Sequence, residues 1–171
     1  NNFDNFILTR KLEAAAGGDS MLNVNGYDVT AFIFGQQQAS LTGAELTVDI
    51  HPHPLDWLHI QNTFSLVSGI LKVPVEGAKY LPFIPASRLN TELRANFKKP
   101  ADNIQNFYAT FDVDITFAKN NIFFAYNTET TSKAYTLLNL GVGADYVLKN
   151  GKKLFSLNIS GTNLADIGYQ N

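Results

Sequence analysis

The sequence predicts an all-β fold of antiparallel strands, and three observations support this prediction. Apolar and polar residues alternate over residues 88–97 and again over residues 107–117, and this is the period of a β-strand, whose successive side chains point to opposite faces. The chain contains 13 Phe and 7 Tyr against 1 Trp, and such an aromatic set favours strands over helices. The connections between the predicted strands alternate between long and short.

Composition sets further bounds. A length of 171 residues suits one domain or a piece of a larger one. The net charge of −2 predicts no nucleic-acid partner, and the absence of cysteine excludes disulfides and thiol chemistry. No apolar run is long enough for a transmembrane helix. No signal-peptide pattern opens the chain, so we expect either that a leader was removed or that Asn1 lies inside a longer polypeptide.

The N-terminal half predicts three strands. Residues 1–12 form a short strand with imperfect alternation, and residues 13–26 form a polar loop because Gly17 and Gly18 interrupt any helix. Residues 27–50 read as one long strand with a bulge at 35–40. Two prolines break the chain at residues 51–56, and alternation resumes over 58–70. A proline-containing loop follows at residues 71–85.

The C-terminal half predicts four more strands. The two alternating runs noted above form a hairpin whose turn covers residues 98–105. A polar loop at residues 118–133 leads to strands at 134–148 and 153–163. Asn150-Gly151 between them predicts a two-residue turn with positive φ at both positions. The chain should therefore contain about seven strands.

The alternation of connection lengths is typical of outer-membrane β-barrels, which have short periplasmic turns and longer extracellular loops. Soluble antiparallel barrels usually lack this asymmetry. A transmembrane barrel also fits the mean hydropathy of −0.07, because its strands alternate lipid-facing and interior residues. We therefore predict an antiparallel up-and-down transmembrane β-barrel.

Aromatic residues flank two of the short turns. Phe97 and Phe107 flank one turn, Tyr146 and Phe155 flank another, and all four have the parity of the apolar face. This placement predicts an aromatic girdle at the lipid interface. The alternative is a soluble sandwich with aromatic residues at the ends of its core.

Five segments in a fixed order carry a family resemblance. They are Ala39–Leu46, His53–Leu58, Leu81–Leu89, Tyr135–Leu140 and Asn158–Asp166. With these segments the chain, from about Tyr27 onward, resembles the C-terminal part of the barrel of TonB-dependent outer-membrane receptors, in particular those of Bacteroides-type bacteria.

The resemblance implies a partial domain and a role in uptake. Members of that family have an N-terminal plug and a barrel of about 22 strands. Residues 1–171 would then form part of such a barrel, without the plug, the earlier strands and the final strand. The implied location is the bacterial outer membrane, and the implied partners are outer-membrane lipid and the TonB system, which acts through the plug. The nutrient would be an iron chelate, haem, cobalamin or a glycan.

Charged residues on the polar face of the central hairpin are the candidates for lining the lumen. They are Arg88, Glu92, Arg94, Asp112 and Asp114. Arg94 should lie opposite or diagonal to Thr110 and Asp112, close enough to pair. We interpret these residues as a charge ladder that fixes the register, with acid–base catalysis as the alternative. No third group accompanies the acids, so we expect no enzymatic activity.

The long loops are the candidates for substrate contact, at Tyr80, Phe83, Tyr126 and Asn127. The alternative for these residues is simple loop packing. His51, His53 and His59 are the only histidines, and no cysteine or suitably spaced carboxylate accompanies them. A zinc site needs four convergent ligands, so we expect neither a metal nor a cofactor.

Two other classes of protein stay open. A soluble antiparallel β-barrel that binds a small apolar ligand would turn the apolar face inward. A structural or adhesive β module is the third possibility.

Overall fold

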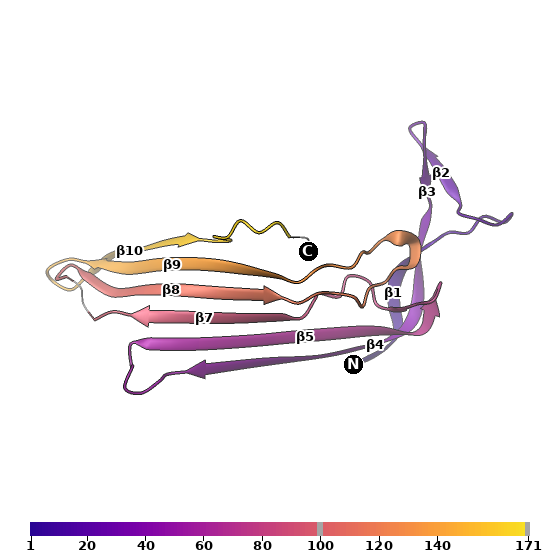
Figure 1. Cartoon of the computed structure of the whole chain (residues 1–171). Coiled ribbons are helices and arrows are strands. Elements are labelled where there is room, and N and C mark those ends of the chain that lie inside the picture. Colours follow the sequence, from indigo (N-terminus) through magenta and orange to yellow (C-terminus); the bar gives the residue numbers. More distant parts are fainter. Residues whose placement is uncertain (99–100, 170–171) are drawn as a thin grey trace. The chain divides into compact units, whose positions relative to one another are not determined.

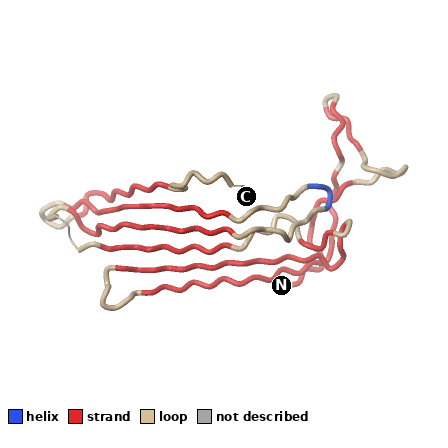
Figure 2. Tube along the Cα trace, viewed as in Figure 1, coloured by secondary structure: helices blue, strands red, loops and turns tan. Residues whose placement is uncertain are grey.

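The computed structural model describes residues 1–98 and 101–169, and β-strands dominate it (Figures 1 and 2). The strands are β1 (Asn2–Lys11), β2 (Met21–Val24), β3 (Tyr27–Thr30), β4 (Phe32–Ile50), β5 (Leu58–Val75), β6 (Ala78–Tyr80), β7 (Arg88–Asn96), β8 (Ile104–Thr116), β9 (Tyr135–Val147) and β10 (Lys153–Gly161). A single 3₁₀ turn covers Ala125–Asn127 within this described part.

Seven strands form the path of the main sheet, in the order β1-β4-β5-β7-β8-β9-β10, and β6 pairs with β5 outside this path. Neighbouring strands are antiparallel. The predicted all-β antiparallel fold and its seven main strands are therefore confirmed. The sheet formed by the described strands is open, because β1 and β10 end the order without pairing to each other.

The chain divides into two compact units. The first unit consists of residues 1–43, 67–84 and 120–131, and the second of residues 44–66, 85–119 and 132–171. Of the residues that the structure describes as buried, only Asp114, Gly143 and Val147 belong to the second unit. The apolar core therefore belongs to the first unit.

The core of the first unit is small and includes residues from a loop as well as from strands. Its buried members are Leu8, Ala39, Leu71, Ala78, Leu81, Phe123 and Ala125. Leu81 packs directly over Gly69: its backbone N–H donates to the Gly69 carbonyl at 3.0 Å, and a Cβ at Gly69 would lie 2.6 Å from Leu81 Cδ1. Only glycine leaves room for this close approach.

The second unit is built on the predicted central hairpin. Strands β7 and β8 pair in unbroken register from Arg88 opposite Thr116 to Asn96 opposite Tyr108. Strand β5 continues the sheet on one side and β9 on the other. The described residues of this unit contain no second layer of strands or helices, so both faces of the sheet carry partly exposed side chains.

Residues 13–30 differ from the prediction. The expected polar loop contains β2, and the expected single strand over 27–50 is interrupted at Ala31, which separates β3 from β4. β2 and β3 form a separate two-stranded ribbon. Asn25 and Gly26 join them with φ values of 53° and 87°, which is the conformation of a tight hairpin turn.

The predicted loop at residues 71–85 is also wrong in part. β5 runs on to Val75 and turns back at once into β6, with Val75 opposite Ala78. The two residues between them, Glu76 and Gly77, both have positive φ. A bulge was expected in β4 near residues 35–40. The extra residue is instead in β1, between Phe3 and Phe6, which lie opposite Ala39 and Gln37 of β4.

The short turns differ from the prediction in detail. In the turn at residues 148–152 the positive φ belongs to Gly151 (80°), whose N–H donates to the Leu148 carbonyl at 2.8 Å. This is the geometry of a longer hairpin loop with one left-handed glycine, not the predicted turn with two positive φ values.

The turn predicted at residues 98–105 ends earlier, because β8 begins at Ile104. Lys99 and Pro100 of that turn lie outside the described residues. Within the described ranges, no helix has the length and apolar character needed to cross a membrane.

Candidate functional site

The polar face of the central hairpin brings together all five charged residues predicted to line a lumen. Cross-strand partners lie on the same face, so the register places these residues together. The face consists of Arg88, Asn90, Glu92, Arg94 and Asn96 from β7 and Tyr108, Thr110, Asp112, Asp114 and Thr116 from β8.

Arg88 and Asp114 form an ion pair at one end of this face. Arg88 Nε donates to Asp114 Oδ1 at 2.6 Å, and the second guanidinium nitrogen donates to Oδ2. Asp114 is the buried polar residue of the described chain, with 5% exposure. A two-point contact of this kind fixes the planes of both groups. It therefore holds the carboxylate in a single orientation.

Two carboxylates face each other in the middle of the hairpin. Glu92 lies directly opposite Asp112, Gln61 of β5 lies opposite Glu92, and Asn139 of β9 lies opposite Asp112. Like charges directly opposite each other destabilise a sheet. This row of amide, carboxylate, carboxylate and amide is therefore an electrostatic cost to the fold and offers four neighbouring oxygen-bearing groups on one face.

Arg94 lies opposite Thr110, as predicted from the alternation. Its contacts differ from the expected pairing with Thr110 or Asp112. The guanidinium lies 3.7 Å from the centre of the Tyr108 ring, and Nε donates to Asn96 Oδ1 at 3.0 Å. A cation over an aromatic face is attracted by the ring quadrupole. The stacking position of Tyr108 was not predicted, although its parity on the polar face was visible in the sequence.

Tyr108 extends past a glycine of the neighbouring strand β9 and reaches β10. Its hydroxyl donates to Asn158 Oδ1 of β10 at 2.6 Å, although β9 lies between β8 and β10. Gly143 lies opposite both residues, and the absence of a Cβ there opens the path for the ring. A network of Asn96, Arg94, Tyr108 and Asn158 thus crosses four strands of the polar face.

Two of the three histidines lie together. The rings of His51 and His59 meet edge to face with their centres 4.4 Å apart, and His51 Nε2 lies 3.3 Å from Asp49 Oδ2. His53 lies in the turn and instead contacts Asp56 at 3.3 Å. Among the residues with described positions, no group of three His, Asp or Glu side chains converges to hold a metal ion.

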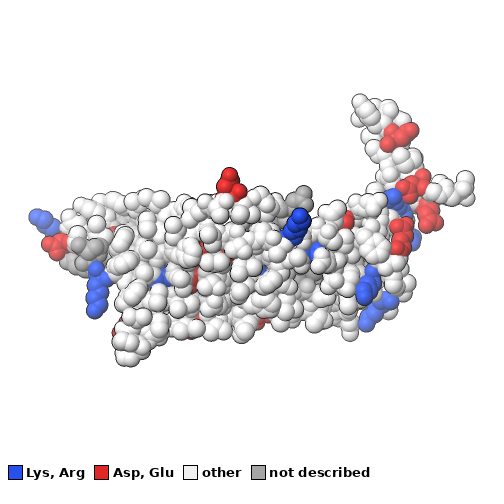
Figure 3. Space-filling view, viewed as in Figure 1, with Lys and Arg blue, Asp and Glu red and all other residues white. Residues whose placement is uncertain are grey.

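The opposite face of the same sheet is apolar, and we call it the apolar face. Many of its large side chains are exposed, namely Leu46, Val48, Ile50, Leu66, Phe97, Phe117, Leu140, Val142, Tyr146, Phe155, Leu157 and Ile159. Few charged atoms are visible over the middle of β7 to β10 in Figure 3. Only isolated exposed apolar residues are normal on a monomer, so a continuous stripe of them needs a partner phase or surface.

The four aromatic residues predicted for a girdle form two pairs beside the short turns. The Phe97 and Phe107 rings lie 5.1 Å apart, and the Tyr146 and Phe155 rings stack at 5.3 Å with an angle of 11° between their planes. Each pair is cross-strand, so the rings share one face of the sheet.

One polar pair interrupts the apolar face. Thr91 of β7 lies opposite Asn62 of β5, and its hydroxyl donates to Asn62 Oδ1 at 2.8 Å. Both residues depart from the alternation of their strands, and alternation alone does not predict that they meet.

The loop candidates belong to the first unit and occupy different environments. Tyr80 ends β6 instead of lying in a loop, and Lys79 lies over its ring at 5.1 Å. Phe83 is 75% exposed and has a positive φ of 59°. Tyr126 packs against Phe123, with ring centres 6.0 Å apart, and burial raises the pKa of its phenol. Packing accounts for Tyr126, whereas Phe83 is open to contact.

Asn127 adjoins Tyr126 in the 3₁₀ turn, and both residues have positive φ. For residues other than glycine such values are uncommon, and they occur most readily at Asn. The position of Asn127 is therefore explained by the turn itself.

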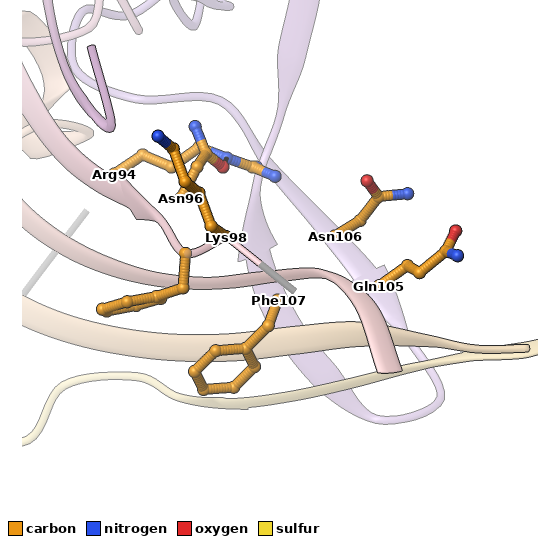
Figure 4. A pocket seen from close by; sticks show the side chains of 7 residues that line it. Arg94, Asn96, Lys98, Gln105, Asn106 and Phe107 are labelled. Atoms are coloured by element: carbon orange, nitrogen blue, oxygen red, sulfur yellow. Dashed lines mark hydrogen bonds between the residues drawn. The ribbon is translucent and has the colours of Figure 1, made fainter. Parts of the chain in front are cut away.

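An open hollow of about 560 Å³ lies beside the turn between β7 and β8 (Figure 4). Phe97 and Phe107 line it together with charged and amide side chains, which are Arg94, Asn96, Lys98, Gln105 and Asn106. Asn106 donates to Asp145 at 2.7 Å, so part of this polar lining is already engaged.

The arrangement as a whole suits contact with water and polar solutes on one face and with apolar material on the other. Arg88 and Asp114 hold each other across β7 and β8, and Arg94 is held by Tyr108 and Asn96. No protein-family model matches the chain, and no curated protein matches it at a significant level. The functional interpretation therefore rests on the different chemical character of the two faces of the sheet.

Proposed function

We propose that this chain forms part of the wall of a bacterial outer-membrane β-barrel of the TonB-dependent receptor type, which takes up a scarce nutrient. The observation that carries the proposal is the two-faced single sheet of the second unit. Its apolar face is uncovered by any described residue, and its other face holds ion pairs and hydrogen-bonded amides. Lipid on one side and an aqueous lumen on the other would satisfy both faces.

Strand length supports the proposal. The main-sheet strands contributing to the second unit run from 9 residues in β7 and β10 to 19 residues in β4. A tilted transmembrane strand needs about 9–11 residues. Each of these strands is therefore long enough to cross the hydrocarbon core.

The connections and the aromatic pairs support it as well. The main strands are joined in turn by long connections (residues 12–31, 76–87 and 117–134) and short ones (51–57, 97–103 and 148–152). Bacterial outer-membrane barrels have this alternation, with aromatic girdles at the interfaces. In this proposal the two aromatic pairs beside the short turns contact the periplasmic lipid interface.

The proposed roles follow from the faces. The ladder with Arg88, Glu92 and Asp114 lines the lumen, and exposed loop residues such as Phe83 are available to the nutrient. The open edges of β1 and β10 pair with further strands, which completes the barrel. An iron chelate, haem, cobalamin or a glycan is the cargo, and TonB drives uptake through a plug domain.

The dependence of folding on detergent tests the proposal. The chain is refolded in plain buffer and in detergent micelles, and circular dichroism and size exclusion follow the product. β-structure that forms only in micelles supports the membrane wall. A folded, monodisperse monomer in buffer alone refutes it and favours the soluble barrel that encloses a small apolar ligand.

A matched pair of variants on β7 sharpens the test. Leu93→Arg places a charge on the apolar face, and Asn90→Arg places the same charge on the polar face, opposite Thr63 and Asp114. Arginine on the lipid face near the midplane costs about 2–4 kcal/mol, whereas lumen positions tolerate it. We expect Leu93→Arg alone to lower the yield of micelle-folded protein. Equal yields from both variants would contradict the assignment of the faces.

A further inference from the structure

The β2–β3 ribbon of the first unit is amphipathic. Cross-strand pairing puts Leu22 opposite Val29 and Val24 opposite Tyr27, so these four side chains share one face. The other face is polar: Asn23 donates to Asp28 at 2.9 Å, and Thr30 lies opposite Met21. The ribbon pairs with no other described strand (Figure 1).

The apolar face of the ribbon is uncovered. Its four members retain between 43% of their surface at Val29 and 77% at Tyr27. Pairing across the ribbon therefore hides only part of them. A two-stranded hairpin is at best marginally stable in water, so a surface that covers this face would also stabilise the ribbon.

Charge limits what that surface can be. Residues 12–31 contain Glu13, Asp19 and Asp28 and no Lys or Arg, whereas the rest of the chain has 13 Lys and Arg against 12 Asp and Glu. We call residues 12–31 the arm, and acidic side chains on it are visible in Figure 3. Asp19 pairs with Lys11 at 2.7 Å. The excess negative charge of residues 12–31 therefore comes from Glu13 and Asp28. Anionic lipid headgroups would repel the arm, and two copies docked arm to arm would repel each other.

We propose that the β2–β3 ribbon is a docking arm for a protein partner whose surface presents an apolar patch bordered by Lys and Arg. The apolar face seats on the patch, and the negative charge of Asp28 and Glu13 attracts the basic border through the intervening solvent. Such charges mainly set the association rate and its salt dependence, and the apolar contacts set the lifetime of the complex.

Site-specific photocrosslinking in the cells that make the chain tests this. A benzophenone amino acid replaces Tyr27 on the apolar face or, as the matched control, Asn23 on the polar face of the same ribbon. We expect a discrete protein adduct at least about fivefold stronger from position 27. The crosslinked peptide should map to an apolar patch flanked by Lys or Arg.

Two variants separate docking from folding of the ribbon. Asp28→Asn removes the charge and keeps an oxygen that can accept from Asn23, and Asp28→Lys reverses the charge. Both leave the apolar face intact. The adduct should weaken with Asn and weaken further with Lys, by about fivefold or more, and added salt should weaken it in the wild type.

Several outcomes would overturn the proposal. These are equal adducts from both faces, an adduct with a second copy of this chain, labelling of lipid alone, no adduct, or an adduct that is indifferent to Asp28→Lys. The experiment is independent of the membrane proposal, since detergent-dependent folding can hold while the crosslink fails, and the reverse.

Discussion

Gly143→Ala should destabilise the fold through a contact on the polar face. A Cβ at Gly143 would lie 2.6 Å from the Tyr108 hydroxyl oxygen and closer still to Asn158 Oδ1. The ring and the amide must therefore move apart. That movement breaks the 2.6 Å hydrogen bond between them and displaces the ring on which Arg94 stacks.

The magnitude follows from these contacts. A hydrogen bond contributes about 0.5–1.5 kcal/mol and an exposed cation–π contact about 0.5–1 kcal/mol. Replacing glycine with alanine stabilises the folded state by about 0.4–1 kcal/mol, because the unfolded chain has less conformational freedom to lose on folding. We expect a net loss of about 1 kcal/mol in the free energy of unfolding.

Urea unfolding measures this loss in the medium in which the chain folds, with the single Trp57 as the fluorescent probe. Gly168→Ala is the matched control, since a Cβ there meets no atom within 4 Å and the backbone is unstrained. The cost of Gly143→Ala should shrink in a Tyr108→Ala background, because the clashing ring is then absent. Equal stabilities for the two alanine variants, or an unchanged cost without the ring, would refute this reasoning.

Three further predictions concern charges. Asp114→Asn should cost about 1–2 kcal/mol in urea unfolding, because it weakens the two-point contact with Arg88, whose own exposure limits the loss. Asp112→Asn should be neutral or stabilising in the same assay, because it removes the negative charge directly opposite Glu92. Burial raises the pKa of Tyr126 above its usual 10.0, so the stability from its protonated phenol is present below that pH and is lost as the pH rises through the folded value. Tyr126→Phe should remove this component, which phenolate absorbance and unfolding at alkaline pH would detect.

The sequence was most informative where alternation was strict. Over residues 88–97 and 107–117 the alternation assigned side chains to faces, and the expectation that Arg94 lies opposite or diagonal to Thr110 was confirmed. Alternation is a local signal, so it predicts faces and neighbours. It does not predict that Tyr108 reaches past β9 to Asn158, because that contact depends on the missing side chain of Gly143 on the strand between them.

The missed ribbon shows a different limit. Asn25-Gly26 has positive φ at both positions and makes a tight turn, whereas Asn150-Gly151, with the same two letters, has positive φ only at the glycine. Short alternating runs flank Asn25-Gly26, and this pattern indicates a hairpin. The segment was nevertheless predicted to be a loop, because Gly17 and Gly18 lie close to it in the sequence. β6 was missed for a related reason, since its three residues are too few to show a period.

The Asn62–Thr91 pair has a consequence for the assembly of the sheet. Sliding β5 along β7 by two residues would keep every side chain on its own face, so alternation alone cannot prevent it. After such a slip Asn62 would face Leu89 or Leu93, and Thr91 would face Ile60 or Phe64, the residues now two places away in the register. An amide facing leucine on the apolar side would lack its partner. This one hydrogen bond therefore selects a single alignment among several that hydrophobicity leaves nearly equal, as a lone buried asparagine does in a coiled coil.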